Sequence, residues 1–296
     1  MTGPFLTGPF LTGPILAGHD PMIGHDHHQQ AGAEHDWAPL AVLAILACAY
    51  LWLAARRRAE PRGWNTWRTA SFTGGLALLA TALTGPVSTL ATTDFRGHML
   101  QHLLTGMLAP LALVLGTPLT LLLRSLPATH ARRLTRLLRS RACHLAANPW
   151  TALTLSVGGM AALYCTPLYR YTSAIPATHH LVHAHFLLSG YLFAWAIAGA
   201  DPAPRRPSVP ARLTVLGVAI AAHATLAQLM YAGLAVDVPA PADQLRGAAE
   251  LMYYGGDIAE LLLALALITT WRPAHRRDHH AGQRTLGSVN DEPRPP

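Results

Sequence analysis

Two histidine pairs with the same spacing are the residues in this sequence best suited to binding a metal. His98 and His102 are four residues apart near the start of one apolar segment, and His179 and His183 repeat the spacing near the start of another. Residues four apart share one face of an α-helix and lie about 6 Å apart along its axis. Because neutral imidazole is a common metal ligand, each pair predicts two ligands presented by one helix.

Further candidate ligands lie close to these pairs. His180 is about 60° from His183 in helical phase and is a possible member of the site, whereas His185 is about 200° away and is expected to face elsewhere. Two ionisable residues in later apolar segments, His223 and Asp257, are also candidates, since such groups are costly inside a membrane and usually functional. Alternatively, His223 and Asp257 form a structural polar bridge between two helices, and this is the interpretation that we favour for these two residues.

Copper is the metal that this ligand set suits best. Met99 lies beside the first histidine pair and Met107 lies two turns further along, so thioether sulfur and imidazole nitrogen occur at the same end of the segment. This combination suits copper, although zinc and haem iron also accept imidazole. Histidines four apart are too close to hold two stacked haems, but one haem between His102 and His183 remains an alternative.

The composition indicates that these pairs lie in an integral membrane protein. Of the 296 residues, 51% are hydrophobic and only 12% are charged, against about 25% charged in an ordinary soluble domain. Seven apolar segments approach the length of about 20 residues that crosses a bilayer. They cover residues 37–55, 69–91, 98–123, 149–168, 180–200, 211–235 and 248–271. The predicted fold is an all-α polytopic membrane protein with seven transmembrane helices, the third broken or bent at Pro110 and Pro118.

The arginines predict how these helices are oriented. The formal net charge is +7, and most of the 22 basic residues, all of them arginine, fall in every second connection between the apolar segments. The positive-inside rule then places the N-terminus outside and the C-terminus in the cytoplasm. Both histidine pairs enter from the outer face at the same depth, which predicts one convergent site. Because the arginines flank apolar segments and form no basic face with aromatics, we expect no nucleic-acid partner.

Three regions follow from this pattern. Residues 1–36 are expected to be a disordered Gly/Pro- and His-rich extracytoplasmic tail, whose histidines and acids are typical of loose metal binding. Residues 37–271 form the seven-helix membrane domain, and residues 272–296 a disordered cytoplasmic tail. The connection 125–148, with leucines among arginines, predicts an amphipathic helix on the lipid surface. No GxSxG, HExxH, Walker or GxGxxG motif occurs, so we do not expect an enzyme.

Several motifs resemble the multispan CtaG-type cytochrome c oxidase assembly factors. They are RGHMLQHLLTGMLAPLALVLGTPLTLLLR, NPW, CTPLYR, HHLVHAHFLLSGYLFAWAIAGADPAPRR and ADQLRG, spread between Trp37 and Trp271. The resemblance implies a multi-pass protein of the bacterial plasma membrane that helps a haem–copper oxidase subunit mature through copper handling, with a copper donor protein as a further partner. By position, His98, His102, His179 and His183 match the family's paired histidines, and Asp243 and Gln244 match its polar lead into the last span. The sequence LMYYGGD departs from the Trp often found in that span.

The leading hypothesis is therefore an assembly factor that binds copper at an outward-facing site of few, soft and partly exposed ligands. Such a site releases its ion more readily than a closed cage does. Two alternatives remain open, a haem-binding membrane redox protein and a copper permease. The second of these would use His223 and Asp257 as a polar path deeper into the bundle.

Overall fold

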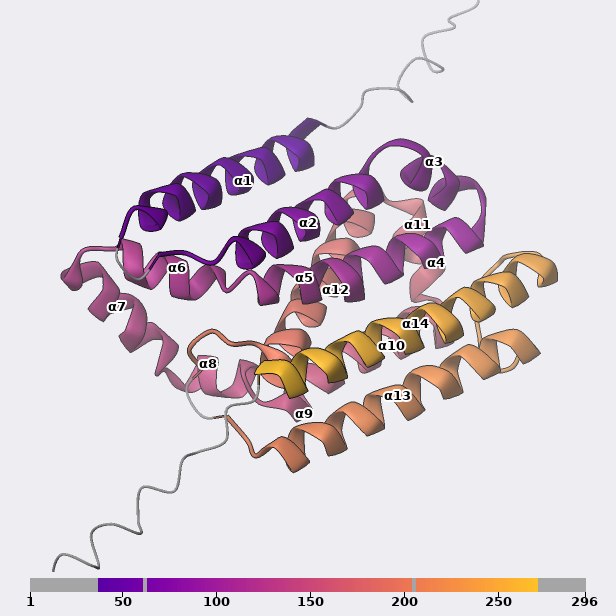
Figure 1. The fold of residues 1–296 in the computed structure, drawn as a ribbon. Coiled ribbons are helices and arrows are strands. Elements are labelled where there is room, and N and C mark those ends of the chain that lie inside the picture. Colours follow the sequence, from indigo (N-terminus) through magenta and orange to yellow (C-terminus); the bar gives the residue numbers. More distant parts are fainter. Residues whose placement is uncertain (1–36, 61–62, 204–205, 271–296) are drawn as a thin grey trace, which may run out of the picture. The chain divides into compact units, whose positions relative to one another are not determined.

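The predicted all-helical fold is confirmed for the described part of the chain. The computed structural model describes residues 37–60, 63–203 and 206–270, apart from the side chains of residues 173, 174, 176, 177 and 179. Every regular element in these ranges is a helix (Figure 1). The predicted tails, 1–36 and 272–296, lie outside the described residues.

The described residues form α-helices and two π-helices. In order they are α1 (Trp37–Arg58), α2 (Thr66–Leu83), α3 (Gly85–Thr93), α4 (Phe95–Leu103), η1 (Leu104–Leu108), α5 (Ala109–Leu115), α6 (Pro118–Ser125), α7 (Ala128–Leu138), α8 (Arg141–Ala146), α9 (Pro149–Leu153), η2 (Thr154–Gly158), α10 (Gly159–Cys165), α11 (Leu168–Ala174), α12 (Pro176–Ala198), α13 (Val209–Ala232) and α14 (Ala242–Thr270). The predicted amphipathic connection contains two short helices, α7 and α8.

Five helical stretches in the described residues are long and apolar enough to cross a membrane. They are Trp37–Arg58, Phe95–Ser125, His180–Ala198, Val209–Ala232 and Ala242–Thr270. A sixth is possible if α2 and α3, which are bent by 43° relative to each other, cross as one span. The fourth predicted span, 149–168, corresponds to α9, η2 and α10, which are not among these stretches. The membrane character is thus supported, while the seven spans and the orientation stay predictions.

Local backbone chemistry explains the bend within the second predicted span. Thr84 is extended, with φ −137° and ψ 166°, and it separates α2 from α3. Gly85 follows with a φ of 67°, a value that glycine adopts without the penalty of a side chain. Pro86 has no backbone N–H and would clash within a continuous helix. The sequence Thr-Gly-Pro therefore ends one helix and starts another.

The third span is interrupted at the two predicted prolines in different ways. Pro110 lies in the first turn of α5, directly after the π-helix η1, where its missing N–H is tolerated. Before Pro118, Thr117 adopts the left-handed conformation with φ 49° and ψ 53°, and a new helix, α6, begins. The side chain of Thr117 does not cap α6. Asp201, from the connection after α12, does so instead.

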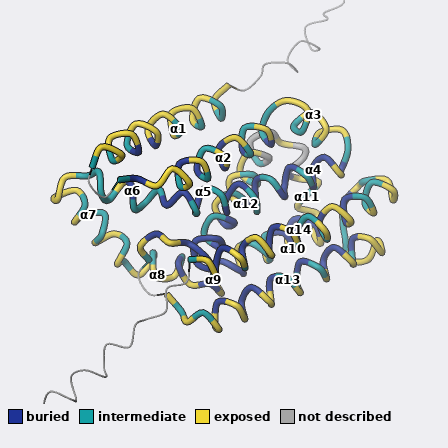
Figure 2. The backbone as a smooth tube through the Cα atoms, viewed as in Figure 1, coloured by how far each residue is buried: buried dark blue, intermediate teal, exposed yellow. Residues whose placement is uncertain are grey.

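The outer surface of the described helices carries many large apolar side chains. Ile45 is 67% exposed, Leu181 68% and Leu261 66%. Figure 2 shows exposed residues along most of α1. Apolar patches of this extent are costly in water and are typical of a surface that faces lipid. A lipid bilayer is therefore the surrounding that fits these helices.

The packing of three spans places the start of α4 in the interior. α4 packs against α14, and α12 packs against the following η1 and α5. α13 lies alongside α14 and completes the surroundings (Figure 1). Because His98 and His102 are on α4, they lie where side chains from α12, α13 and α14 can approach them.

Candidate metal site

Two side chains fix the first turn of α4 and so position its histidines. Asp94 accepts a hydrogen bond from the backbone N–H of Arg96 at 2.8 Å, and Gln244 of α14 accepts one from the N–H of Phe95 at 3.1 Å. Hydrogen bonding from the Arg96 guanidinium and backbone holds the pKa of the Asp94 carboxyl below its ordinary value. Helix starts leave N–H groups unpaired, and these two acceptors satisfy them. Gln244, singled out from the polar lead into the last span, thus joins α14 to α4.

Aromatic rings enclose both histidines of α4. Phe95 stacks on His98 with ring centroids 5.6 Å apart, and Tyr169 meets the same ring edge-on at 5.2 Å. Phe186 of α12 meets His102 edge-on at 4.5 Å. The sequence analysis did not predict these aromatic neighbours of the histidines. The one signal for them was the CTPLYR motif, which contains Tyr169.

Tyr164 is the aromatic residue that both histidines share. Its ring centroid lies 6.1 Å from that of His98 and 6.3 Å from that of His102, both in edge-on geometry. The side chain is fully buried, and its hydroxyl has no hydrogen-bond partner among the described residues. An ordinary apolar role would be filled by Phe, so the buried hydroxyl marks this position as part of the polar site.

The expectation of a partly exposed site is wrong for this pair, because His98 and His102 are each only 7% exposed. The connection between α13 and α14 packs across the same end of the bundle. Its Asp237 N–H donates to the Tyr164 carbonyl at 2.8 Å, and the Asp237 carboxylate pairs with Arg170 at 2.5 Å. Val238 of this connection is buried in the same apolar cluster as Phe95 and Tyr164.

His102 is the centre of the histidine arrangement. It interacts electrostatically with His98 on its own helix, with His183 on α12 and with His223 on α13. Its Nδ1 atom is buried and has no hydrogen-bond partner among the described residues. His183, from the second predicted pair, and His223 therefore lie in the same region of the bundle as His102.

Three other predicted ligands are His179, His180 and Met99. The side chain of His179 lies outside the described residues, and His180 is exposed on α12. Met99 is fully buried within an apolar cluster that contains Met160 and Met252, so its surroundings are those of a core residue. His185 approaches the carbonyl of Leu155 at 3.1 Å, a contact that ties α12 to η2.

The polar bridge predicted between His223 and Asp257 is wrong, because His223 pairs with Glu260. The distance from His223 Nδ1 to Glu260 Oε1 is 3.2 Å, and both side chains are buried. The inward face of α14 runs through Gly256, Glu260 and Leu263, at helical spacing, while Asp257 lies beside that face and is half-buried. Sequence phase alone did not show which of the two acids faced α13.

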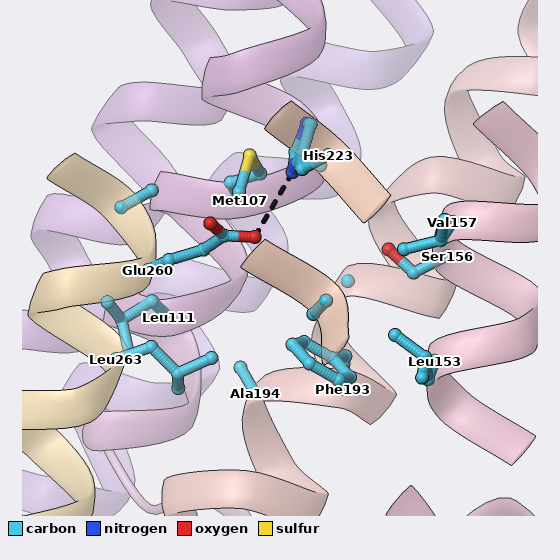
Figure 3. A pocket seen from close by; sticks show the side chains of 14 residues that line it. Met107, Leu111, Leu153, Ser156, Val157, Phe193, Ala194, His223, Glu260 and Leu263 are labelled. Carbon is cyan, nitrogen blue, oxygen red and sulfur yellow. Dashed lines mark hydrogen bonds and ion pairs between the residues drawn. The ribbon is translucent and has the colours of Figure 1, made fainter. Parts of the chain in front are cut away.

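A cavity of about 40 Å³ adjoins the His223–Glu260 pair (Figure 3). Met107 from η1 and Ser156 from η2 also line it, and most of its other lining is apolar. A single water needs roughly 10–15 Å³ of such space, so the cavity can accept a few waters or an ion. The two π-helices thus contribute to the same place, and π-helical turns often occur at functional sites.

Within the ranges that the structure covers, no group of three or more His, Cys, Asp or Glu side chains is arranged to hold a metal ion. The four-histidine site predicted from the sequence stays a prediction, because the side chain of His179 lies outside the described residues. Its second pair is described only through His183. What the described residues provide is a buried imidazole nitrogen without a partner and three further histidines near it.

Comparison with known proteins gives one family and several relatives. A family model described as cytochrome c oxidase caa3 assembly factor matches residues 48–274. Uncharacterised proteins of Mycobacterium bovis (strain ATCC BAA-935 / AF2122/97) and Mycobacterium tuberculosis (strain CDC 1551 / Oshkosh) are each 32% identical over 262 residues, which is 80% of this chain. The match spans 40% of the length of these relatives. No solved structure matches the chain.

Proposed function

The chain belongs to the cytochrome c oxidase caa3 assembly factor family, and on that premise we propose that it binds copper at the buried histidines and supplies it to a haem–copper oxidase subunit. The bacterial plasma membrane, a seven-span topology with the N-terminus outside, a copper donor protein and a non-catalytic role are parts of the same proposal. The chain spans only 40% of the length of the curated relatives that it matches. The activity of those longer proteins therefore does not carry over to it.

One observation carries the proposal, the unpartnered Nδ1 atom of His102. Buried polar atoms almost always have a hydrogen-bond partner, and leaving one without costs about 1–3 kcal/mol. A metal ion bound at this nitrogen would remove that cost. The neighbouring histidines supply more imidazole nitrogens, a ligand type that suits copper.

The proposed ligands are His98, His102 and His183, with His179 as a fourth. Met99 and His180 are weaker candidates, since one lies in an apolar cluster and the other is exposed. A site with few ligands releases its ion more readily than a closed cage. Copper is the cargo in this mechanism and leaves with the oxidase subunit.

Because the histidines are buried, copper can bind and leave only if the residues packed around them move. The histidines lie beneath Tyr164, Tyr169 and the connection that carries Asp237. The Arg170–Asp237 ion pair is partly exposed, with side-chain exposures of 59% and 32%, so it is a weak closure. We therefore expect copper exchange to be slow unless a partner protein moves this connection.

The test is the double replacement His98→Ala plus His102→Ala in the full chain. The variant should still insert in the membrane but should lose tight copper binding, measured as bound copper per purified protein at a fixed concentration of competing chelator. The matched control is His130→Ala, because this histidine is exposed on α7. Oxidase copper content in cells should fall with the double variant and not with the control. Stoichiometric copper on the purified double variant would place the site elsewhere.

The same preparations distinguish the alternative functions. A Soret band sensitive to dithionite would support a haem redox protein instead. A copper permease is the second candidate, and the cavity with the buried polar pair His223 and Glu260 is the observation that favours it. Copper uptake into proteoliposomes that contain the purified protein would support it.

A further inference from the structure

The cavity beside the histidine cluster holds side chains that the proposed function does not use. Met107 and Ser156 approach it from the π-helices η1 and η2, and His223 and Glu260 approach it from α13 and α14 (Figure 3). Leu153, Phe193 and Leu263 are among the apolar residues that make up the rest of the lining. A sulfur atom, an imidazole and a carboxylate therefore face one small space inside an otherwise apolar bundle.

The His223–Glu260 pair is only half satisfied by its internal hydrogen bond. His223 Nδ1 and Glu260 Oε1 are 3.2 Å apart, but His223 Nε2 and Glu260 Oε2 are buried and have no partner among the described residues. The side chains are 8% and 3% exposed. Two unpaired polar atoms in an apolar interior are costly, so a bound species that satisfies them would stabilise the protein.

The geometry of the pair favours a metal ion as that species. When Nδ1–H donates to a carboxylate, the lone pair of the imidazole is on Nε2, which is the arrangement of metal-bound histidines that a carboxylate orients. Imidazole nitrogen and thioether sulfur together suit monovalent copper. Met107 supplies the thioether in the same cavity.

Charge balance selects a monovalent ion. An ionised Glu260 contributes one negative charge, and its hydrogen-bonding partner in the described residues is a histidine that is neutral when it binds a metal. A monovalent ion would leave the site neutral, whereas a divalent ion would leave an uncompensated charge inside the membrane, which is costly.

We propose that His223 Nε2 and Met107 Sδ bind a second Cu(I) ion in this cavity, with Glu260 orienting His223 and balancing the charge of the ion. The identity of the ion rests on the proposed function. Gly106 lines the cavity, and a Cβ atom added at Gly106 would lie 3.4 Å from His102 Cε1, so the cavity adjoins the histidine cluster. The protein would then hold two copper ions in neighbouring positions.

The test is a Cu(I) titration of the full chain against bicinchoninate, a chelator that outcompetes weak sites such as exposed histidines. Wild-type protein should retain two ions. Met107→Leu, which nearly conserves volume, should retain one ion, and its copper X-ray absorption should lose the sulfur scattering contribution. Met252→Leu, a fully buried methionine on α14, is the matched control and should keep both ions and the sulfur signal.

Glu260→Gln tests the orienting role separately. Removing a carboxylate that orients a metal-bound histidine typically weakens binding about 10–100-fold, and we expect such a loss for one of the two ions. Glu250→Gln, an exposed position on the same helix, should change nothing. Unchanged stoichiometry, affinity and sulfur scattering in Met107→Leu, His223→Ala and Glu260→Gln, all folded and membrane-inserted, would overturn the inference.

The outcomes separate this inference from the proposed function. His98→Ala plus His102→Ala should remove the ion of the histidine cluster and leave the sulfur-containing ion in place. If the double variant keeps both ions while Met107→Leu loses one, the histidine-cluster proposal fails and the cavity site stands. If only the double variant loses copper, the cavity site fails and the histidine-cluster proposal stands.

Discussion

Asp201 is a single residue that joins two spans far apart in the chain. It is 1% exposed, and its carboxylate accepts hydrogen bonds from the backbone N–H groups of Leu119 and Thr120, at 3.1 and 2.7 Å. It also accepts one from the Thr120 hydroxyl at 2.5 Å. These donors are at the start of α6, where a carboxylate is favoured by both hydrogen bonding and the helix dipole. This aspartate of the motif HHLVHAHFLLSGYLFAWAIAGADPAPRR thus has a structural role.

Replacing Asp201 should destabilise the protein without removing a proposed ligand. Asp201→Ala leaves two partly buried N–H groups without their acceptor, so we expect a loss of about 2–4 kcal/mol in the free energy of unfolding. Asp201→Asn keeps one acceptor oxygen and should lose less. Thermal unfolding of the purified variants, monitored by circular dichroism, should rank their stability as wild type, then Asp201→Asn, then Asp201→Ala. A melting temperature for Asp201→Ala equal to that of the wild type would contradict it.

At the scale of the elements, the close contact of η1 with α12 determines how near the two histidine-bearing spans can come. Gly190 of α12 lies against Gly106 of η1, and a Cβ atom at Gly190 would overlap the Gly106 carbonyl and lie 3.2 Å from Pro110 Cγ. Small residues at such crossings let helices approach closely in membranes. Since His102 precedes η1 and His183 lies on α12, this crossing also determines the separation of the two histidines.

Adding one methyl group at this crossing should separate the spans. Gly190→Ala must displace backbone rather than a flexible side chain, so we expect a cost of at least about 3 kcal/mol. The matched control is Gly217→Ala in α13, where an added Cβ meets nothing within 4 Å and the change should be neutral or stabilising by up to about 1 kcal/mol. Thermal unfolding distinguishes the two variants. Copper binding, if the histidine proposal holds, should fall in Gly190→Ala alone.

At the scale of the whole molecule, the topology depends on one short segment. α9, η2 and α10 together run from Pro149 to Cys165, and this segment is not among the helices long enough to span by themselves. The arginine distribution nevertheless predicts that it crosses, because the connection before it is arginine-rich and the connection after it is not. A short segment can span if the bilayer thins locally or flanking side chains extend to the interface.

Cysteine labelling in intact cells tests this crossing in the full chain. Cys48, Cys143 and Cys165 are first replaced by serine, and Arg139→Cys or Tyr171→Cys then introduces one exposed thiol on either side of the segment. A membrane-impermeant maleimide should label the variant with Tyr171→Cys directly. It should label the variant with Arg139→Cys only after the membrane is permeabilised. Equal labelling of both in intact cells would exclude the crossing and the seven-span topology.

The sequence by itself determined the helical class, the membrane setting and the family. Apolar runs of membrane length, few charges and no strand pattern leave few other folds, because backbone polar groups in lipid must be satisfied within helices. The paired histidines could also be recognised, since helical spacing alone places His98 and His102 on one face. These features are local in the chain, so no knowledge of packing was needed to find them.

Only the tertiary structure decided which polar groups meet. Periodicity gives the direction of a side chain to within about one helical position, which did not separate Asp257 from Glu260 as the partner of His223. It also could not show that Tyr164 contacts both histidines or that the connection with Asp237 packs against Tyr164. Contacts between helices depend on their crossing points and on π-helical turns such as η1, which shift the phase of the residues that follow. The cavity at Met107 and Glu260 arises from such contacts, and no single segment of the sequence encodes it.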